Sequence, residues 1–265
     1  MYPIIDCHCH VYPSKIAEKA VKGIGDFYNL NMFYDGKAET LLSESQKYGI
    51  VKSFIFSVAT KPEQTNSINE FIKGIIDQYP QSFVGMGALH PDSTKLDEEI
   101  EKIISLGLKG VKLHPDVQGF QLDDERCMRI FEKCEGRLPV LVHAGDKRYD
   151  NSNPDRLKKI LDTFPRLTVI GAHFGAYSVW DDVSILKGYD NLYVDCSSAM
   201  AFITPRKATE LVRFYSAEKV LFATDFPMWN IGDELKRFDA LDLTDRERQM
   251  IFYENACNLF GLNIS

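Results

Sequence analysis

The stretch LPVLVHAGDKRYDNSNPDRLKKILDTFPRLTVIGAHFG, residues 138–175, contains one full repeat of the pattern that runs through this chain. A short apolar run is followed by an amphipathic segment of helical period, and a second apolar run comes after it. The amphipathic segment begins with Asn153-Pro154, a capping residue followed by proline in the first helical turn. The stretch therefore predicts a strand, a helix and a further strand.

The same alternation extends over most of the sequence. Eight apolar runs occur, namely PIIDCHCHV, VKSFIFSVA, SFVGMGALH, LKGVKLHP, LPVLVHAG, LTVIGAHFG, LYVDCSS and VLFATDF. From the third run onward they begin near residues 83, 110, 139, 168, 192 and 220, so each step has the length of one strand, one helix and two short loops. Eight such units predict an α/β fold, a single (β/α)8 TIM barrel domain over residues 1–265.

An open doubly wound sheet is the alternative, because it gives the same alternation. No glycine-rich phosphate-binding loop follows any of the apolar runs, and this favours the barrel. Two segments lie outside the repeat. Residues 11–38 make the first connection long, and we expect them to form a lid, whereas residues 244–262 predict an extra C-terminal helix.

Charge and hydropathy narrow the classes of partner. The net charge of -7 and the absence of basic runs argue against nucleic acid as a partner. No apolar run approaches the roughly 20 residues of a membrane helix, and the first residues do not resemble a signal peptide, so we expect a cytoplasmic protein with no membrane partner.

Six cysteines without framework spacing predict buried thiols and no disulfide. The expected partner is a small-molecule substrate, and the expected oligomer is a homodimer.

The first apolar run contains DCHCH, residues 6–10, which could belong to a zinc knuckle or to a strand. Successive side chains of a strand point to opposite faces. His8 and His10 therefore share one face with Asp6, while Cys7 and Cys9 share the other. A single site that uses both cysteines and both histidines cannot form on a regular strand, so we interpret the cysteines as small buried hydrophobic residues.

The histidines of the chain gather at the carboxyl ends of the predicted strands, where barrel enzymes have their active sites. The six are His8, His10, His90, His114, His143 and His173. The eighth strand ends in the same way with Asp225. Imidazoles that converge with a carboxylate favour a divalent cation, which would be Zn2+, Mn2+, Fe2+ or Co2+. We interpret His90, which precedes a proline, as a core residue outside this set.

These residues resemble the metal-dependent amidohydrolase superfamily, which has H-x-H after the first strand, histidines after the fifth and sixth strands and an aspartate after the eighth. Segments such as NLYVDCSS and LFATDFPMW resemble its amidohydrolase-related branch, which includes hydrolases and aminocarboxymuconate-semialdehyde decarboxylase-like enzymes. The resemblance implies that His8, His10, His143 and Asp225 bind one metal, for which we expect Zn2+. It also implies that His173 acts as an acid/base group or ligates a second metal.

Three further residues are candidates for substrate binding: Lys112 and His114 in GVKLHP, and Arg148 in the loop after the fifth strand. Lys112 is placed as in the dihydroorotases, where a carboxylated lysine bridges two metals. We favour instead a lysine that pairs with a substrate carboxylate or extends its ammonium to solvent.

The ligand set is compatible with more than one reaction. We favour hydrolysis of an amide, lactone or ester-like bond of a small anionic molecule by metal-activated water, with Asp225 and His173 as the catalytic acid/base pair. The alternative is non-oxidative decarboxylation of a small carboxylic acid at the same site. A non-catalytic binding barrel is a third hypothesis, and the complete ligand set argues against it.

Overall fold

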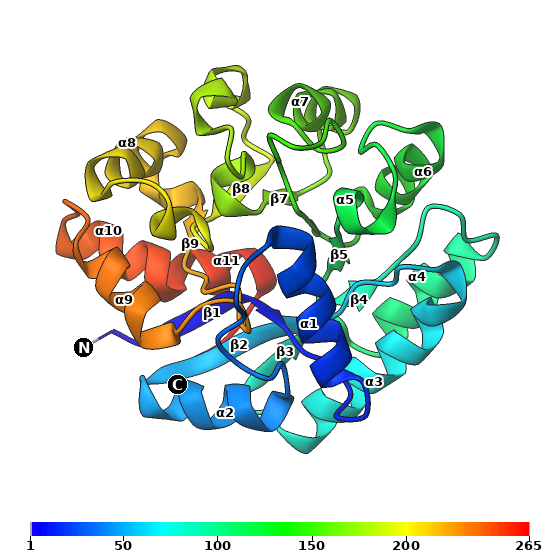
Figure 1. Cartoon of the computed structure of the whole chain (residues 1–265). Coiled ribbons are helices and arrows are strands. Elements are labelled where there is room, and N and C mark those ends of the chain that lie inside the picture. The colour runs from blue at the N-terminus through cyan, green and yellow to red at the C-terminus, as the bar shows by residue number, and fades with distance from the viewer. Residues whose placement is uncertain (1, 265) are drawn as a thin grey trace. The chain divides into compact units, whose positions relative to one another are not determined.

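Strands and helices alternate through residues 2–264, the part of the chain that the computed structural model describes (Figure 1). The strands are β1 (Ile4–His10), β2 (Ile50–Phe56), β3 (Phe83–Gly85), β4 (Gly87–Ala88), β5 (Val111–Leu113), β6 (Val140–Val142), β7 (Val169–Gly171), β8 (Leu192–Asp195) and β9 (Val220–Leu221). The α-helices are α1 (Ala17–Tyr28), α2 (Ala38–Lys47), α3 (Thr65–Gln78), α4 (Leu96–Ser105), α5 (Pro115–Gln118), α6 (Glu125–Cys134), α7 (Pro154–Thr163), α8 (Pro205–Tyr215), α9 (Ile231–Asp239), α10 (Asp245–Gln249) and α11 (Asn255–Phe260). Shorter elements are the 3-10 helices η1 (Pro62–Gln64), η2 (His173–Gly175), η3 (Trp180–Leu186), η4 (Ala199–Ala201) and η5 (Ala217–Lys219) and the π-helix η6 (Met250–Glu254).

Each of the eight apolar runs contains a strand, as the sequence predicts. The third run forms two short strands, β3 and β4, because its pairing is interrupted at Met86. Helix α7 begins at Pro154, where the Asn153-Pro154 pair predicts it, and α8 begins in the same way at Pro205, directly after Thr204. At the start of α8 the Thr204 hydroxyl accepts the backbone N–H of Lys207, which satisfies one of the free donors of the first turn.

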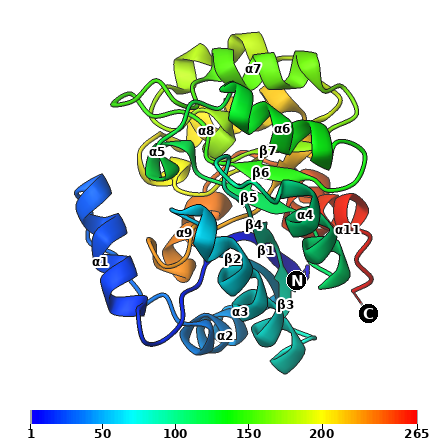
Figure 2. The same cartoon turned by 90° about the vertical axis from the view of Figure 1, so that its right-hand side faces the viewer.

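The chain divides into two compact units that are interleaved in sequence. Unit 1 comprises residues 2–56, 75–84 and 196–264 of the described chain. Its strands β1 and β2 are parallel, and α2 packs on β2. Figure 2 shows α1, which belongs to the long first connection, farther from these strands than α2. Backbone hydrogen bonds from Cys7 N to Phe222 O (3.0 Å) and from His10 N to Phe226 O (2.7 Å) join β1 to the segment after β9.

Unit 2 comprises residues 57–74 and 85–195. Its strands β4, β5, β6, β7 and β8 form one parallel sheet in sequence order. Helices α4, α6 and α7 lie on one face of that sheet (Figure 1). Their apolar stripes are buried there, with Ile100 in α4, Ile130 in α6 and Ile160 in α7 all inaccessible to solvent. The predicted site residues of this unit, His114, His143 and His173, follow the carboxyl ends of β5, β6 and β7.

Two expectations from the sequence concern the chain as a whole. Within residues 2–264, no helix is both long enough and apolar enough to cross a membrane. None of the six cysteines forms a disulfide, and all but Cys257 are buried. The absence of a disulfide agrees with the spacing of the cysteines, while the single-domain organisation and the lid role of residues 11–38 stay predictions.

Candidate metal centre

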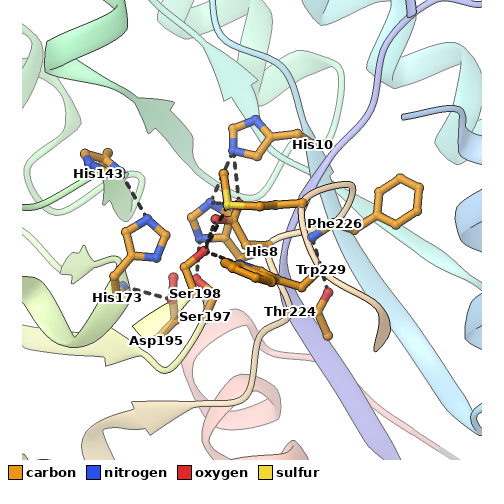
Figure 3. Close-up of polar contacts among 12 residues, drawn as sticks. His8, His10, His143, His173, Asp195, Ser197, Ser198, Thr224, Phe226 and Trp229 are labelled. Atoms are coloured by element: carbon orange, nitrogen blue, oxygen red, sulfur yellow. Dashed lines mark hydrogen bonds and ion pairs between the residues drawn. The ribbon is translucent and has the colours of Figure 1, made fainter. Parts of the chain in front are cut away.

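The first group of predicted ligands lies in unit 1, at the end of β1. The Nε2 atoms of His8 and His10 are 3.3 Å apart, so the two imidazoles share a face of the strand as the alternation predicts (Figure 3). Cys7 and Cys9 are buried, and burial raises the pKa of the Cys9 thiol well above its ordinary value. A neutral thiol is a poor metal ligand, which agrees with the interpretation of these cysteines as core residues.

The third predicted ligand, Asp225, follows β9 in a loop and has a positive φ of 60°. Asp6 fixes the start of this loop against β1, because its carboxylate accepts the backbone N–H (3.0 Å) and the hydroxyl (2.5 Å) of Thr224. Asp6 also accepts the backbone N–H of His8 (3.2 Å). Burial raises the pKa of Asp6 to about 6. Asp6 therefore links the two segments that carry the ligands.

The spacing of these donor atoms fits a bound cation. Asp225 Oδ1 lies 3.5 Å from His8 Nε2 and 3.8 Å from His10 Nε2. Ligands of an ion with bonds of about 2.1 Å lie about 3.0–3.5 Å from one another, so small movements would place all three around one ion. Two imidazole nitrogens and one carboxylate oxygen suit zinc or manganese. The residues present in unit 1 thus fit the metal that the sequence predicts.

A second group of predicted residues lies in unit 2, at the ends of β5, β6 and β7. His143 Nδ1 is 3.0 Å from His173 Nε2 (Figure 3), and the ring of His114 stacks on that of His143 with centroids 4.0 Å apart. The backbone of His173 is held in a left-handed conformation, with its N–H donated to Asp195 (3.1 Å) and its carbonyl accepting the indole N–H of Trp180 (2.9 Å). These contacts fix the backbone of His173 and so the position of its Cβ atom, from which the imidazole extends.

The structure adds Asp116, at the start of α5, to this second group. Its Oδ2 lies 3.6 Å from His143 Nε2, and burial raises the pKa of the carboxyl to about 6. His114, Asp116 and His143 have potential ligand atoms that all lie within 4.8 Å of one another. Asp116 is not among the residues that the sequence predicts, because it lies in α5, after the end of β5, where alternation no longer indicates which side chains share a face.

The other residues singled out from the sequence, Lys112, Arg148 and His90, differ in burial and in hydrogen-bond partners. Lys112 is inaccessible to solvent, which excludes one of its two predicted alternatives, an ammonium extended to solvent, and leaves pairing with a substrate carboxylate as a prediction. Arg148 forms a two-pronged ion pair with the buried Asp146, with Nη2 at 2.6 Å from Oδ2 and Nε at 3.0 Å from Oδ1. His90 accepts the backbone N–H of Asp92 through Nδ1 (3.2 Å), and burial lowers its pKa, as expected of a structural histidine.

The structure therefore brings His8, His10 and Asp225 together in unit 1, and His114, His143 and His173 together in unit 2. That His143 completes the ligand set of unit 1 stays a prediction, as do the substrate-binding roles of Lys112, His114 and Arg148.

The fold has known relatives among solved structures. A TIM-barrel protein of uncharacterized function from Bordetella bronchiseptica is 19% identical, with a TM-score of 0.79 and coverage of 98% of both chains. A dihydroxybenzoic acid decarboxylase from Polaromonas sp. JS666, with bound manganese and an inhibitor, is 18% identical, with a TM-score of 0.76 and coverage of 100% of this chain and 98% of that one. A 5-carboxyvanillate decarboxylase from Sphingomonas paucimobilis is 15% identical, with a TM-score of 0.76 and coverage of 99% and 100%. These likenesses confirm the predicted α/β barrel.

The class that fold and site define is thus an α/β barrel with nitrogen and oxygen donors for a divalent metal. The family described as amidohydrolase matches residues 5–262, and the chain belongs to it. It is an enzyme of the amidohydrolase superfamily, as the resemblance of the motifs implies. A curated relative, the 2-amino-3-carboxymuconate-6-semialdehyde decarboxylase of Dictyostelium discoideum, is 34% identical over 70 residues. That match covers 26% of this chain and only 20% of the relative.

Proposed function

We propose that this enzyme is a metal-dependent, non-oxidative decarboxylase of a small carboxylic acid, with an unsaturated or aromatic acid as the substrate class. The observation that carries the proposal is the group formed by His8, His10 and Asp225, whose donor atoms have the spacing of metal ligands. Membership of the amidohydrolase family and the named decarboxylases among its relatives support this reaction over others.

The divalent cation would be held by His8, His10 and Asp225, with His143 as the proposed fourth ligand. When bound, it would orient the carboxylated substrate and, through a neighbouring oxygen of the substrate, stabilise the negative charge that develops on carbon as CO2 leaves. Zinc is the metal expected from the sequence, whereas the dihydroxybenzoic acid decarboxylase of similar fold contains manganese. Nitrogen and oxygen donors suit both ions, so we propose manganese alongside zinc as the native metal.

The chain's own residues would supply binding and proton transfer. In decarboxylation the bond between the ring carbon and the carboxyl carbon breaks, CO2 leaves, and the remaining carbon takes up a proton. We assign that proton to His173 or Asp225, the two acid/base groups that the sequence predicts. His173 suits the task because its backbone is fixed by Asp195 and Trp180, which limits the positions that its imidazole reaches.

Lys112 would provide a positive charge for the substrate. Its side chain is buried in unit 2 on β5, the strand that leads to His114. A buried cation stabilises a carboxylate more than an exposed one does, because the local dielectric constant is lower. Arg148 is the weaker candidate for this role, since its guanidinium is already engaged by Asp146.

Hydrolysis, the reaction favoured by the sequence, uses the same donors, whereas the relatives described above whose names state a reaction are decarboxylases. The test is therefore direct. Metal-loaded enzyme is incubated with a panel of hydroxylated aromatic carboxylates, lactones and amides, and both CO2 release and bond hydrolysis are recorded. We expect CO2 release from at least one carboxylate and its loss in Asp225→Asn and His173→Asn.

A matched control is His90→Asn, which changes another buried histidine near a strand end and retains an acceptor for the N–H of Asp92. This variant should keep the activity of the unmodified enzyme. Hydrolysis of a lactone or amide without CO2 release from any carboxylate would refute the decarboxylase proposal and restore the hydrolase hypothesis.

A further inference from the structure

We propose that Ser197 and Ser198 position two of the metal ligands, His8 and Asp225, and that Trp229 in turn fixes Ser198. The two serines stand next to each other in unit 1, and their side chains reach different ligands. Both are buried, at 0% and 1% exposure. The inference rests on metal binding at this site and holds whichever reaction the enzyme catalyses.

The contact between Ser198 and Asp225 determines which carboxylate oxygen faces the histidines. The Ser198 hydroxyl donates to Asp225 Oδ2 at 2.5 Å. The other oxygen, Oδ1, is the one that faces His8 and His10. A carboxylate with one oxygen occupied in this way presents the other to a metal as a single ligand atom. Ser198 therefore selects the orientation of Asp225 before any metal arrives.

Trp229 determines which hydrogen bond the Ser198 hydroxyl accepts and which one it donates. Its indole N–H donates to Ser198 Oγ at 2.8 Å (Figure 3). An indole nitrogen only donates, so the hydroxyl accepts from Trp229 and directs its own proton to Asp225. The Trp229 ring is held in turn by an edge contact with Phe202, with centroids 5.6 Å apart. A chain of donors thus runs from Trp229 through Ser198 to Asp225.

Ser197 acts on the other ligand through a different atom. Its Oγ lies 3.3 Å from His8 Nδ1, on the side of the ring opposite the Nε2 that faces His10 and Asp225. A ring nitrogen that binds a metal carries no proton, so the proton of neutral His8 must be on Nδ1. With a metal on Nε2, Ser197 would accept that proton's hydrogen bond and hold the orientation of the ring, the usual task of a residue behind a metal ligand.

The backbone at Ser198 supports a role for its hydroxyl. Ser198 has a φ of 56°, in the left-handed region that favours glycine. Glycine would relieve the local backbone cost there, but it would leave Asp225 Oδ2 and the Trp229 indole without this partner. Comparing Ser198→Gly with Ser198→Ala therefore separates the effect of losing the hydroxyl from the effect of backbone strain. Both variants lose the hydroxyl, and only glycine adopts the positive φ without strain.

The experiment measures the affinity of metal-stripped protein for Mn2+ by competition with a chelating dye, together with the electron paramagnetic resonance spectrum of the bound ion. We expect Ser198→Ala and Ser198→Gly both to weaken binding by about 10–100-fold and to alter the spectrum. Ser197→Ala should weaken it by about tenfold, since its contact is longer. Trp229→Phe, which keeps the ring and loses the N–H, should have a smaller effect in the same direction.

Ser45→Ala is the matched control, because Ser45 is also buried in unit 1 and its hydroxyl pairs with that of Ser53 (3.2 Å) instead of with a ligand. It should bind Mn2+ like the unmodified protein. Melting temperatures of the metal-free proteins show which variants are folded. If Ser198→Gly is folded and binds Mn2+ with unchanged affinity and spectrum, the proposal is refuted; if Ser198→Ala does not fold, Ser198→Gly and Trp229→Phe decide the question alone. Loss of affinity in Ser45→Ala equal to that in Ser198→Ala would also overturn it.

Discussion

Replacing Glu234 by Gln should stabilise the metal-free enzyme at alkaline pH. Glu234 lies in the first turn of α9 and is inaccessible to solvent. One carboxylate oxygen accepts a hydrogen bond from Arg237, and the other has no hydrogen-bond partner among residues 2–264. Burial raises the pKa of Glu234 from 4.5 to about 7, the charge of Arg237 lowers it, and the charges of Asp225 and Asp6 raise it further.

The sign of the effect follows from proton binding. The folded protein holds the Glu234 proton more tightly than the unfolded chain, so this group contributes stability below pH 4.5 that is lost as the pH rises through about 7. A change in pKa from 4.5 to about 7 corresponds to about 3 kcal/mol, since one unit is worth ~1.4 kcal/mol. Glutamine has nearly the same shape and never ionises, so it should escape this loss.

Urea unfolding of the metal-free protein at about pH 5 and about pH 8.5 tests the prediction. The two proteins should differ little at the acidic pH, where Glu234 is protonated in the folded state, and this serves as the internal control. At the alkaline pH Glu234→Gln should be more stable by about 2–3 kcal/mol. A variant that is equally stable or less stable than the unmodified protein there would mean that Arg237 compensates the buried charge fully, and the reasoning would be wrong.

Three further predictions concern the ligands and their supports. His8→Ala should lose bound metal, which elemental analysis of protein purified without chelator would show as a fall from about one equivalent; retention of full metal would place the site elsewhere. The double substitution Cys7→Ala, Cys9→Ala should keep the metal and lower the free energy of unfolding by about 1 kcal/mol per site in urea titration, and loss of metal would contradict the alternation of β1. Gln118→Ala should cost about 2–4 kcal/mol in the same titration, because it removes hydrogen bonds to two buried carbonyls and one backbone N–H, and a cost below about 1 kcal/mol would show that water replaces them.

Much of the fold could be predicted because it depends on periodicity. The apolar runs mark the strands, and the alternation of side chains along β1 is enough to separate His8 and His10 from Cys7 and Cys9. Parallel strands end at the same edge, so histidines at strand ends predict a common site without knowledge of loops. The break at Met86 that divides the third strand has no such periodic signal, and the sequence did not predict it.

The residues that hold the predicted ligands in place could not be predicted in this way, because their positions depend on the conformations of loops. Ser198 reaches Asp225 only through a left-handed backbone conformation, which serine seldom adopts. Asp116 lies beyond the strand end, where the alternation rule no longer applies. The solvent-extended alternative for Lys112 fails for a related reason: the period of a strand gives the face of a side chain, but not how deeply neighbouring elements cover it.

The reaction is harder to predict than the metal, and the reason is chemical. Two imidazoles and a carboxylate determine that a divalent cation is held, and hydrolysis and decarboxylation both require that much. The two reactions differ in what the acid/base groups do next: one needs a base that takes a proton from water, the other an acid that gives a proton to carbon. Asp225 has Oδ2 occupied by the Ser198 hydroxyl and Oδ1 directed toward His8 and His10, and this geometry favours it as a ligand over a proton donor. His173, whose backbone is fixed on both sides, is then the better candidate for the proton donor of a decarboxylase, and its substitution should stop CO2 release while leaving Mn2+ bound at the unit 1 ligands.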